Sequence, residues 1–300
     1  MIDLVQWNSN RINESVSGFF KESSNSLLKI EEQEIGNILD LYTDQILNPR
    51  RRTGLDQKQA WEKGWDEIAQ KYKSTNSLES LLPQYYNKDI FRFKGSFYKS
   101  NNKVIEADFV HRLISDCIKQ FVTEESTIIE LGCGTGHNLV HLSKNYPDLN
   151  LIGYEYADSA VQLINKYSKD HNLKISSYPF DYYNCSNLAQ EINLLNHPII
   201  YTCASLEQLG GFWQPIYKQL SSIKDATIIH IEPFSEIYNQ SSIYDLSSLS
   251  FHHARGYLSG YASFIHLQES LNRLNIIEKH RTTFGTTFHE PYNVMIWKKK

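Results

Sequence analysis

The sequence has few cysteines and no long apolar run. No segment approaches the roughly 18 consecutive apolar residues that cross a bilayer, so no membrane span is expected. The four cysteines include no CxxC pair, which argues against a metal site and a disulfide framework. The first residues, MIDLVQWNSNRINES, lack the basic start and apolar centre of a signal peptide. These absences predict a soluble protein in a reducing cytoplasm.

Excess positive charge is also missing. The chain has 30 basic and 34 acidic residues, for a formal net charge of −4. Nucleic-acid binding normally rests on clustered Lys and Arg. The one dense basic cluster, NPRRRTG at 48–54, lies between two helical patterns and is interpreted as a solvated linker. We therefore expect no nucleic-acid partner.

Apolar residues are abundant, and in the N-terminal part of the chain their spacing indicates helices. The 300 residues are 41% hydrophobic, enough for one large domain or for one domain plus an appendage. Residues 1–30 show no clear period, whereas 31–47, 57–72 and 105–122 each place apolar side chains on one helical face. Between the last two, alternating aromatic and charged residues predict a short hairpin that turns at Gly95.

From residue 127 onward, strands and helices alternate. The expected strands are 127–131, 150–155, 174–180, 198–203 and 226–232, and the expected helices are 136–145, 158–169, 185–194 and 213–222. Uninterrupted apolar strands between helices predict a parallel sheet covered on both faces. A loop-rich stretch is expected from 232 to about 259. After it come a helix at 261–274 and two antiparallel strands at 275–284 and 292–300.

A glycine-rich loop follows the first of these strands, in the segment ELGCGTGHN. Its three glycines stand at alternate positions, Gly132, Gly134 and Gly136. A P-loop would require Lys and then Ser or Thr after the last glycine, where this chain has His and Asn. A dinucleotide fingerprint would require GxGxxG, one residue longer than the spacing here. Glu130 directly before the loop would repel a pyrophosphate but attract a positively charged amino group.

This loop resembles motif I, [DE]xGxGxG, of the class I S-adenosylmethionine-dependent methyltransferases. Glu155 ends the next strand, Asp181 and Tyr182 follow the third, and YTCASLEQLGG follows the fourth, as in that family. The resemblance covers about 120–300. It implies a seven-stranded Rossmann-like α/β sheet with an antiparallel terminal strand, and S-adenosyl-L-methionine as cofactor.

The same resemblance assigns expected roles to the acidic residues. It implies that Glu130 attracts the methionine ammonium group, Glu155 binds the ribose hydroxyls, and Asp181 faces the adenine amino group. Tyr182 could then pack on the purine. The loop glycines allow the backbone to approach the cofactor, because no Cβ intervenes.

Residues that contact the methyl acceptor are expected beyond the carboxyl ends of the strands. The candidates are Glu207 after the fourth strand, Glu232 at the end of the fifth, and His252 and His253 in the insertion SFHHARGYLSGY. The histidines could supply a base near neutral pH. Other interpretations stay open: Glu207 on a helix surface, Glu232 as a structural cap, and both histidines facing solvent.

The expected organisation is a helical N-terminal region at 1–104, a candidate substrate cap, followed by a methyltransferase domain at 105–300. We expect methyl transfer to an O or N atom of a small molecule, such as a specialised metabolite or a sugar intermediate. A peptide or protein side chain is the alternative acceptor, and a catalytically silent binding module is a third hypothesis. Cys203 is interpreted as a packed residue, because the nucleophilic cysteine of some nucleic-acid methyltransferases follows a proline, which is absent here.

Overall fold

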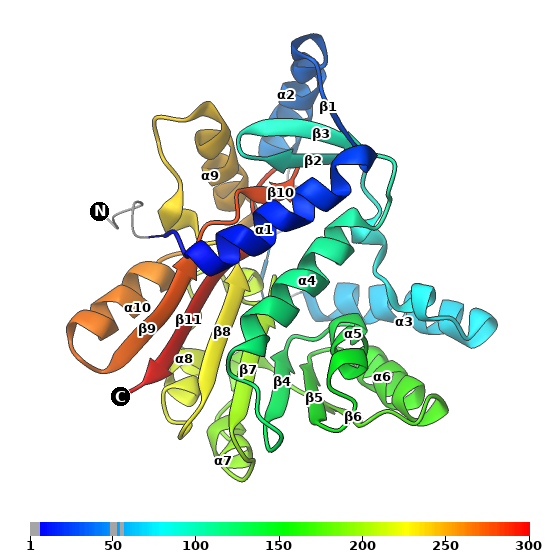
Figure 1. Ribbon diagram of the computed structural model, residues 1–300, viewed down its shortest axis with the longest axis vertical. Helices are drawn as coiled ribbons and strands as arrows, with labels where there is room; N and C mark the ends of the chain where they lie inside the picture. Colours follow the sequence, from blue (N-terminus) through cyan, green and yellow to red (C-terminus); the bar gives the residue numbers. More distant parts are fainter. Residues whose placement is uncertain (1–6, 49–52, 55–56) are drawn as a thin grey trace.

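The structure is a computed structural model that describes residues 7–48, 53–54 and 57–300 (Figure 1). The interpretation of the basic cluster as a linker falls mostly on residues 49–52, which lie outside the described residues. Within the described ranges, no helix combines the length and apolar character needed to cross a membrane.

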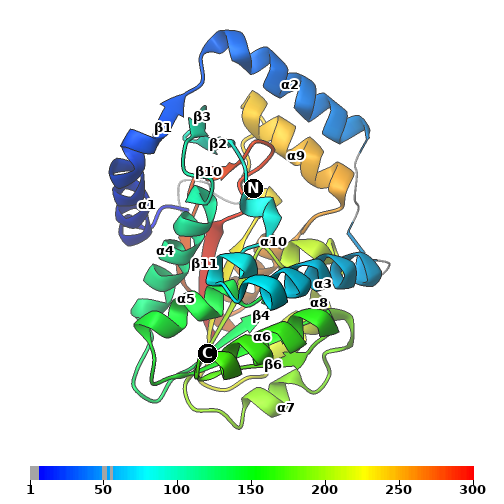
Figure 2. The same ribbon diagram turned by 90° about the vertical axis from the view of Figure 1, so that its right-hand side faces the viewer.

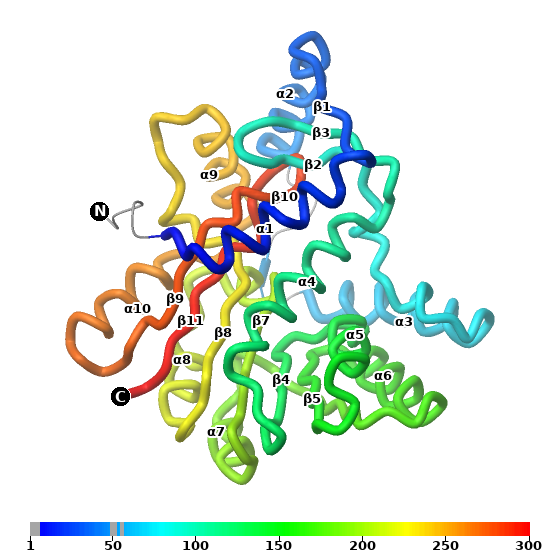
Figure 3. The backbone as a smooth tube through the Cα atoms, viewed as in Figure 1, coloured from blue at the N-terminus to red at the C-terminus, as the bar shows by residue number. Residues whose placement is uncertain are grey.

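A seven-stranded sheet has the order β6-β5-β4-β7-β8-β11-β9. The first five strands in this order are parallel, and β11 runs antiparallel to both β8 and β9. Figure 3 shows this late strand inserted between its two neighbours. The predicted sheet with an antiparallel terminal strand is therefore confirmed. The strand bounds are β4 Thr127–Leu131, β5 Asn150–Glu155, β6 Ile175–Pro179, β7 Pro198–Cys203, β8 Thr227–Glu232, β9 Leu274–His280 and β11 Asn293–Lys299.

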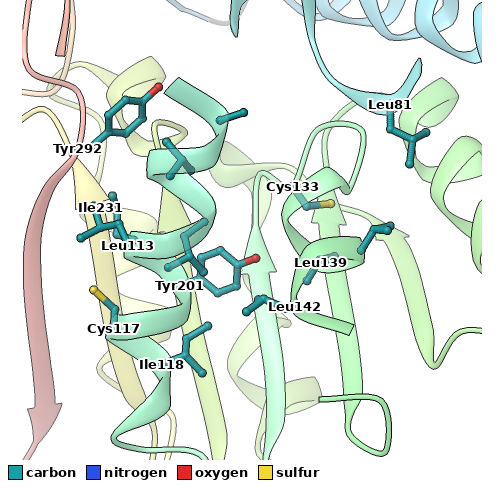
Figure 4. Close-up of a cluster of buried hydrophobic side chains, with 14 of the residues drawn as sticks. Leu81, Leu113, Cys117, Ile118, Cys133, Leu139, Leu142, Tyr201, Ile231 and Tyr292 are labelled. Atoms are coloured by element: carbon teal, nitrogen blue, oxygen red, sulfur yellow. The ribbon is translucent and has the colours of Figure 1, made fainter. Parts of the chain in front are cut away.

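Helices cover both faces of the sheet, which explains why its central strands are apolar throughout. One core joins strand side chains to α4 Ile105–Lys119, α5 His137–Asn145 and α6 Asp158–Asp170. The other joins them to α7 Leu188–Ile192, α8 Gln214–Leu220 and α10 Tyr261–Ser270. Figure 4 shows Leu113, Cys117 and Ile118 of α4 lying over Tyr201 and Ile231 in the first core.

The N-terminal region contributes helices and a second, smaller sheet. Its elements are α1 Asn10–Ser23, β1 Leu27–Lys29, α2 Glu32–Leu47, α3 Lys58–Thr75, β2 Ile90–Phe93 and β3 Ser96–Ser100. The hairpin predicted to turn at Gly95 is confirmed. Helix α1 carried no clear period in the sequence. It begins where the Ser9 hydroxyl accepts the Ile12 N–H, and it packs along α4.

The small sheet has the order β1-β3-β2-β10, and β10 Phe284–Thr286 comes from the C-terminal part of the chain. Its Phe284 ring lies 6.0 Å from the Phe91 ring of β2 and 4.2 Å from the Phe109 ring of α4. Residues from both sides of the expected boundary at 104/105 therefore share one sheet and one core.

The stretch from 232 to 259, expected to be loop, contains helix α9 Ile243–Arg255. This expectation was wrong because the helix depends on tertiary partners rather than on an apolar stripe. Arg281 pairs with Asp245 at 2.7 Å, and the fully buried Arg92 of β2 donates to Ser248 at 2.8 Å. Arg92 also lies 3.4 Å from Glu290. This buried ionic network fixes α9 against the small sheet, and α2 lies alongside α9 (Figure 2).

Single turns of 3-10 helix complete the fold. Three of them carry residues discussed below: η5 Gln84–Tyr86, η6 Tyr182–Asn184 and η7 Leu206–Leu209. The others are η2 Ser24–Ser26, η4 Leu78–Leu81 and η8 Ser235–Ile237.

Candidate active site

A cavity of about 360 Å³ lies at the carboxyl ends of β4, β5, β6 and β7. Its walls come from the glycine loop, the segments after β5, β6 and β7, helix α3 with η5, the end of α9, and the β10–β11 connection. Figure 2 shows α3 lying beside α6 at this end of the sheet. The position is the one at which parallel α/β sheets bind their ligands.

The glycine loop is closely packed. Gly132 has φ 74°, and a Cβ there would lie 2.5 Å from the Cβ of Ser205. Gly136 has φ 73° and precedes α5, where a Cβ would lie 2.7 Å from Ile164 of α6. Both positions therefore require glycine. Gly132 and Gly134 line the cavity, whereas Gly136 serves helix packing.

Glu130 lies at the base of the cavity with only 1% of its surface exposed. Its Oε1 accepts a hydrogen bond from Asn138 at 2.7 Å, and its Oε2 is buried without a hydrogen-bond partner in the structure. Burial raises the pKa of this carboxyl to about 8. A buried acceptor of this kind is suited to a charged donor such as an ammonium group.

Glu155 connects the glycine loop to the end of β5. Its Oε2 accepts the Gly134 N–H at 2.7 Å and its Oε1 accepts the Ala157 N–H at 3.1 Å. Burial raises the pKa of Glu155, and these backbone hydrogen bonds oppose the shift. Each carboxylate oxygen keeps a second lone pair. The residue also lines the cavity, so it can still accept hydroxyl groups from a ligand.

Asp181 and Tyr182 follow β6 and line the same cavity. The Asp181 side chain accepts the Tyr183 N–H at 2.8 Å. The Tyr182 hydroxyl donates to the Leu131 carbonyl at 2.8 Å and lies 2.9 Å from the Ser205 hydroxyl. The tyrosine is therefore fixed next to the glycine loop.

Aromatic side chains of the N-terminal region form the opposite wall. A Cβ on Gly134 would lie 3.2 Å from the Trp65 ring, which stacks on Trp61 at 5.5 Å. Tyr85 and Tyr86 of η5 pack together at 4.7 Å. Helix α3 is fastened to α6, because the Ser159 N–H donates to Glu62 at 2.9 Å.

Glu207 is the candidate acceptor-contacting acid that the structure places in the cavity wall. It lies in η7 and is 8% exposed. Its Oε1 accepts from Gln208 at 2.8 Å, while its buried Oε2 has no hydrogen-bond partner in the structure. Burial, and then the negative charge of Glu232, raises the pKa of Glu207 to about 8.

Glu232 is fully buried and lies outside the cavity wall. Its carboxylate accepts the backbone N–H groups of Ser205, Leu206 and Glu207 at 3.1, 3.0 and 3.2 Å. Burial raises its pKa to about 7. The structure therefore gives Glu232 a positioning role for η7, in place of the substrate contact expected from the sequence.

Neither histidine of the predicted pair lines the cavity. His252 is buried in α9, and its Nε2 lies 3.0 Å from Nδ1 of His289, which does line the cavity. His253 is exposed and lies outside the wall. Consecutive residues of a helix point about 100° apart, and in α9 His252 faces the core while His253 faces solvent. A direct role as base is therefore not supported for either residue.

Several cavity residues carry no signal in the sequence. Glu106 accepts from Lys88 at 3.0 Å and from the Tyr292 hydroxyl at 2.7 Å, and all three line the cavity. Arg255 and Tyr257 lie within the insertion that was examined for histidines. No local spacing connects residues from such distant segments. Cys203 also lines the cavity, and burial raises the pKa of its thiol well above the usual range, against a thiolate nucleophile.

Comparisons with known proteins agree with this geometry. Residues 124–198 match a family described as "Putative methyltransferase". The carboxy-S-adenosyl-L-methionine synthase of Campylobacter hominis is 28% identical over 87 residues. That alignment covers 29% of this chain and 37% of the relative, so the chain spans little more than a third of the length of this curated relative.

Two solved structures are similar over most of the chain. An S-adenosylmethionine-dependent methyltransferase from Anabaena variabilis is 15% identical, with a TM-score of 0.47, and the match covers 83% of this chain and 98% of that one. A geranyl diphosphate C-methyltransferase from Streptomyces coelicolor is 11% identical, with a TM-score of 0.45 and coverage of 78% and 97%.

The residues around the glycine loop fit S-adenosyl-L-methionine. The buried Oε2 of Glu130 lacks a hydrogen-bond donor, and Gly132, Gly134 and Glu155 line the same cavity. The family match covers this loop and the strands on either side of it. Residues 124–198 thus resemble a methyltransferase family, and the sheet order with the antiparallel β11 is that of a Rossmann-like methyltransferase fold.

Proposed function

We propose that the protein transfers a methyl group from S-adenosyl-L-methionine to an O–H or N–H group of a small molecule. One observation carries this proposal. A single cavity contains both the glycine loop with its acidic residues and, farther along, the buried carboxyl of Glu207 with an unpartnered oxygen. The glycine loop with its acidic residues suits the methyl donor. The carboxyl of Glu207 suits a methyl acceptor that must lose a proton.

At the donor end, three acidic residues would hold S-adenosyl-L-methionine. Glu130 would receive the methionine ammonium group, Glu155 the ribose hydroxyls, and Asp181 the adenine amino group. Tyr182 would border the purine. When bound, the cofactor supplies a methyl group activated by a positively charged sulfur. Charge-assisted hydrogen bonds to buried carboxylates are strong, so Glu130 and Glu155 would contribute most of the polar recognition.

At the acceptor end, Glu207 in its ionised form would act as general base. It would take the proton that the acceptor O–H or N–H loses as its new bond to the methyl carbon forms and the bond from that carbon to sulfur breaks. Glu232 would hold Glu207 in place through the backbone of η7. The cavity walls would align the two reactants, which is itself a large part of the rate acceleration.

The aromatic wall from α3 and η5 favours a small acceptor over a peptide. Trp61, Trp65, Tyr85 and Tyr86 line the cavity from the N-terminal region, and they would serve as the substrate cap expected for 1–104. A volume of about 360 Å³ lies in the range of small-molecule sites. A peptide side chain remains the second candidate acceptor. A silent binding module is disfavoured, because the acids at both ends of the cavity are intact.

The cofactor assignment can be tested by thermal unfolding with S-adenosylhomocysteine. A ligand that binds only the folded state at a hundred times its Kd adds about 2.7 kcal/mol of stability, so the melting temperature should rise by several degrees. Glu155→Gln should reduce this shift. Glu236→Gln is a matched control, because Glu236 is a partly buried acid outside the cavity. An unchanged melting temperature at millimolar ligand would exclude the proposed cofactor site.

A further inference from the structure

Three side chains line the cavity where α9 ends and the β10–β11 connection begins: Arg255, Tyr257 and His289. Arg255 donates from Nη2 to the Tyr257 hydroxyl at 3.3 Å. The rings of Tyr257 and His289 lie 5.6 Å apart. Tyr257 and His289 are both more than nine-tenths buried. The three therefore form one compact group, which the function proposed above does not use.

Each member of this group can donate a hydrogen bond to a ligand. Arg255 Nε is buried without a partner, and among the described residues no carboxylate forms an ion pair with this guanidinium. Tyr257 accepts from Arg255 and keeps its own proton to donate. Burial raises the pKa of Tyr257, so it remains a phenol. An unpartnered buried donor costs free energy until a ligand supplies an acceptor.

The third donor follows from the histidine pair. His252 Nδ1 is buried without a partner. An orphaned N–H is rarer in proteins than an orphaned lone pair, so the His252 proton is assigned to Nε2, which donates to His289 Nδ1 at 3.0 Å. This places the His289 proton on Nε2. Burial holds the pKa of both histidines well below the usual range, so both are neutral. His252 is thus a positioning residue for His289.

The charges in the surrounding wall leave this group positive. Glu106 is compensated by Lys88 and by the Tyr292 hydroxyl. Glu207, with its raised pKa, is mostly protonated at neutral pH. While Glu207 is protonated, Arg255 therefore contributes a positive charge that no ion-paired carboxylate cancels within the described part of the wall. Arg255 and Glu207 line the same cavity, so the two can contact different groups of one molecule.

We propose that Arg255, Tyr257 and His289 form a seat for an anionic group, a carboxylate or a phosphate, on the methyl acceptor. The acceptor would then be a small acid whose O–H or N–H lies towards Glu207. That the bound molecule is the methyl acceptor rests on the function proposed above. The seat itself can be examined without any methyl transfer.

The test compares simple probes that differ in charge. Titration calorimetry with the S-adenosylhomocysteine complex should show saturable binding of benzoate or phenyl phosphate. Benzamide and benzylamine should bind at least about tenfold more weakly, because they lack the negative charge. Tighter binding of benzoate would indicate a carboxylate on the acceptor, and tighter binding of phenyl phosphate would indicate a phosphate. Arg255→Gln and His289→Phe should each weaken anion binding, with Arg255→Gln causing a loss of about tenfold or more.

Arg112→Gln is the control, since Arg112 pairs with Glu22 on the surface and lies outside the cavity. It should leave anion binding unchanged. Three outcomes would overturn the seat: no binding of either anion at millimolar concentration, equal binding of benzamide or benzylamine, or Arg255→Gln within twofold of the parent. Binding of S-adenosylhomocysteine by the same variants is measured separately, so loss of the cofactor site is distinguished from loss of the anion seat.

Discussion

Glu207 shows how the environment of one residue sets a pH dependence. Burial raises its pKa to about 8, so at neutral pH most molecules carry the protonated acid, which cannot accept a proton. As general base, Glu207 must be ionised. We expect kcat/KM to rise with pH and level off above about 8, because this quantity reports the pKa values of the free enzyme. Glu207→Gln should lower kcat/KM by about 100-fold or more.

The variant also shows whether the pH profile belongs to this carboxyl. Glu130 has a similarly raised pKa of about 8, so the parent profile alone cannot distinguish the two. In Glu207→Gln the residual activity should lose most of its rise between pH 7 and 9. Glu236→Gln should keep both the rate and the profile. If Glu207→Gln retains the parent rate, Glu207 is not the base.

At the scale of single residues, the sequence predicted the donor end better than the acceptor end. The glycine loop, Glu130 and Glu155 are connected by fixed spacing, and all but Gly136 line the cavity. Glu207 and Glu232 both follow strands at the same edge. The turn after β7 determines which of the two carboxyls faces the cavity. No local sequence pattern predicts the direction of that turn. The anion seat joins residues from α9 and from the β10–β11 connection, which only the fold brings together.

Among the elements, the turn η7 depends on the end of β8. Three consecutive N–H groups at the start of η7, from its N-cap Ser205 and from Leu206 and Glu207, donate to the Glu232 carboxylate. Glu232→Gln replaces one acceptor oxygen by an NH₂ group, which would face a backbone donor. We expect a loss of about 1–3 kcal/mol in the free energy of unfolding, and a fall in kcat of at least about tenfold as Glu207 moves. Chemical denaturation and steady-state kinetics measure the two effects.

A purely structural role would lower stability and leave kcat alone, so the comparison must be made where the variant is fully folded. S-adenosylhomocysteine affinity should stay within about threefold, because Glu232 does not line the cavity. Thr227→Ser, at the other end of β8, is a control for mild destabilisation of the same strand. Unchanged kcat in folded Glu232→Gln would refute the positioning role.

Buried strands of the sheet were predicted correctly, whereas two helices, α9 and α1, were not. β4, β5 and β7 coincide with the predicted ranges, because buried parallel strands are continuous apolar runs between turns. α9 is amphipathic only weakly, and it is fixed by Arg92 and Arg281 from distant segments. α1 lies in a Ser- and Asn-rich stretch and depends on packing against α4.

At the scale of the whole molecule, buried ionisable groups set the pH of maximum stability. Burial raises the pKa of Glu130 and Glu207 to about 8 and that of Glu232 to about 7, from 4.5. At pH values between 4.5 and these raised pKa values, the folded state binds more protons than the unfolded chain. The free energy of unfolding contributed by these carboxyls therefore falls as pH rises. Burial lowers the pKa of buried histidines such as His137 and His230 to about 3, from 6.5. Their contribution increases stability as pH rises, but only up to about 6.5.

Well above pH 6.5 the buried histidines are neutral in both states, so in that range the carboxyls alone determine the trend. The ligand-free protein should therefore be most stable near pH 6 and lose stability between pH 7 and 8.5, by on the order of 1 kcal/mol per pH unit for each carboxyl that is still protonated. Urea unfolding at constant ionic strength measures this slope. Glu207→Gln should make it shallower, because the amide does not titrate, whereas Glu269→Gln on the surface should not change it. A slope of zero or a rise over this range would show that these carboxyls are already ionised in the folded protein, and it would also remove the alkaline shift expected for the base.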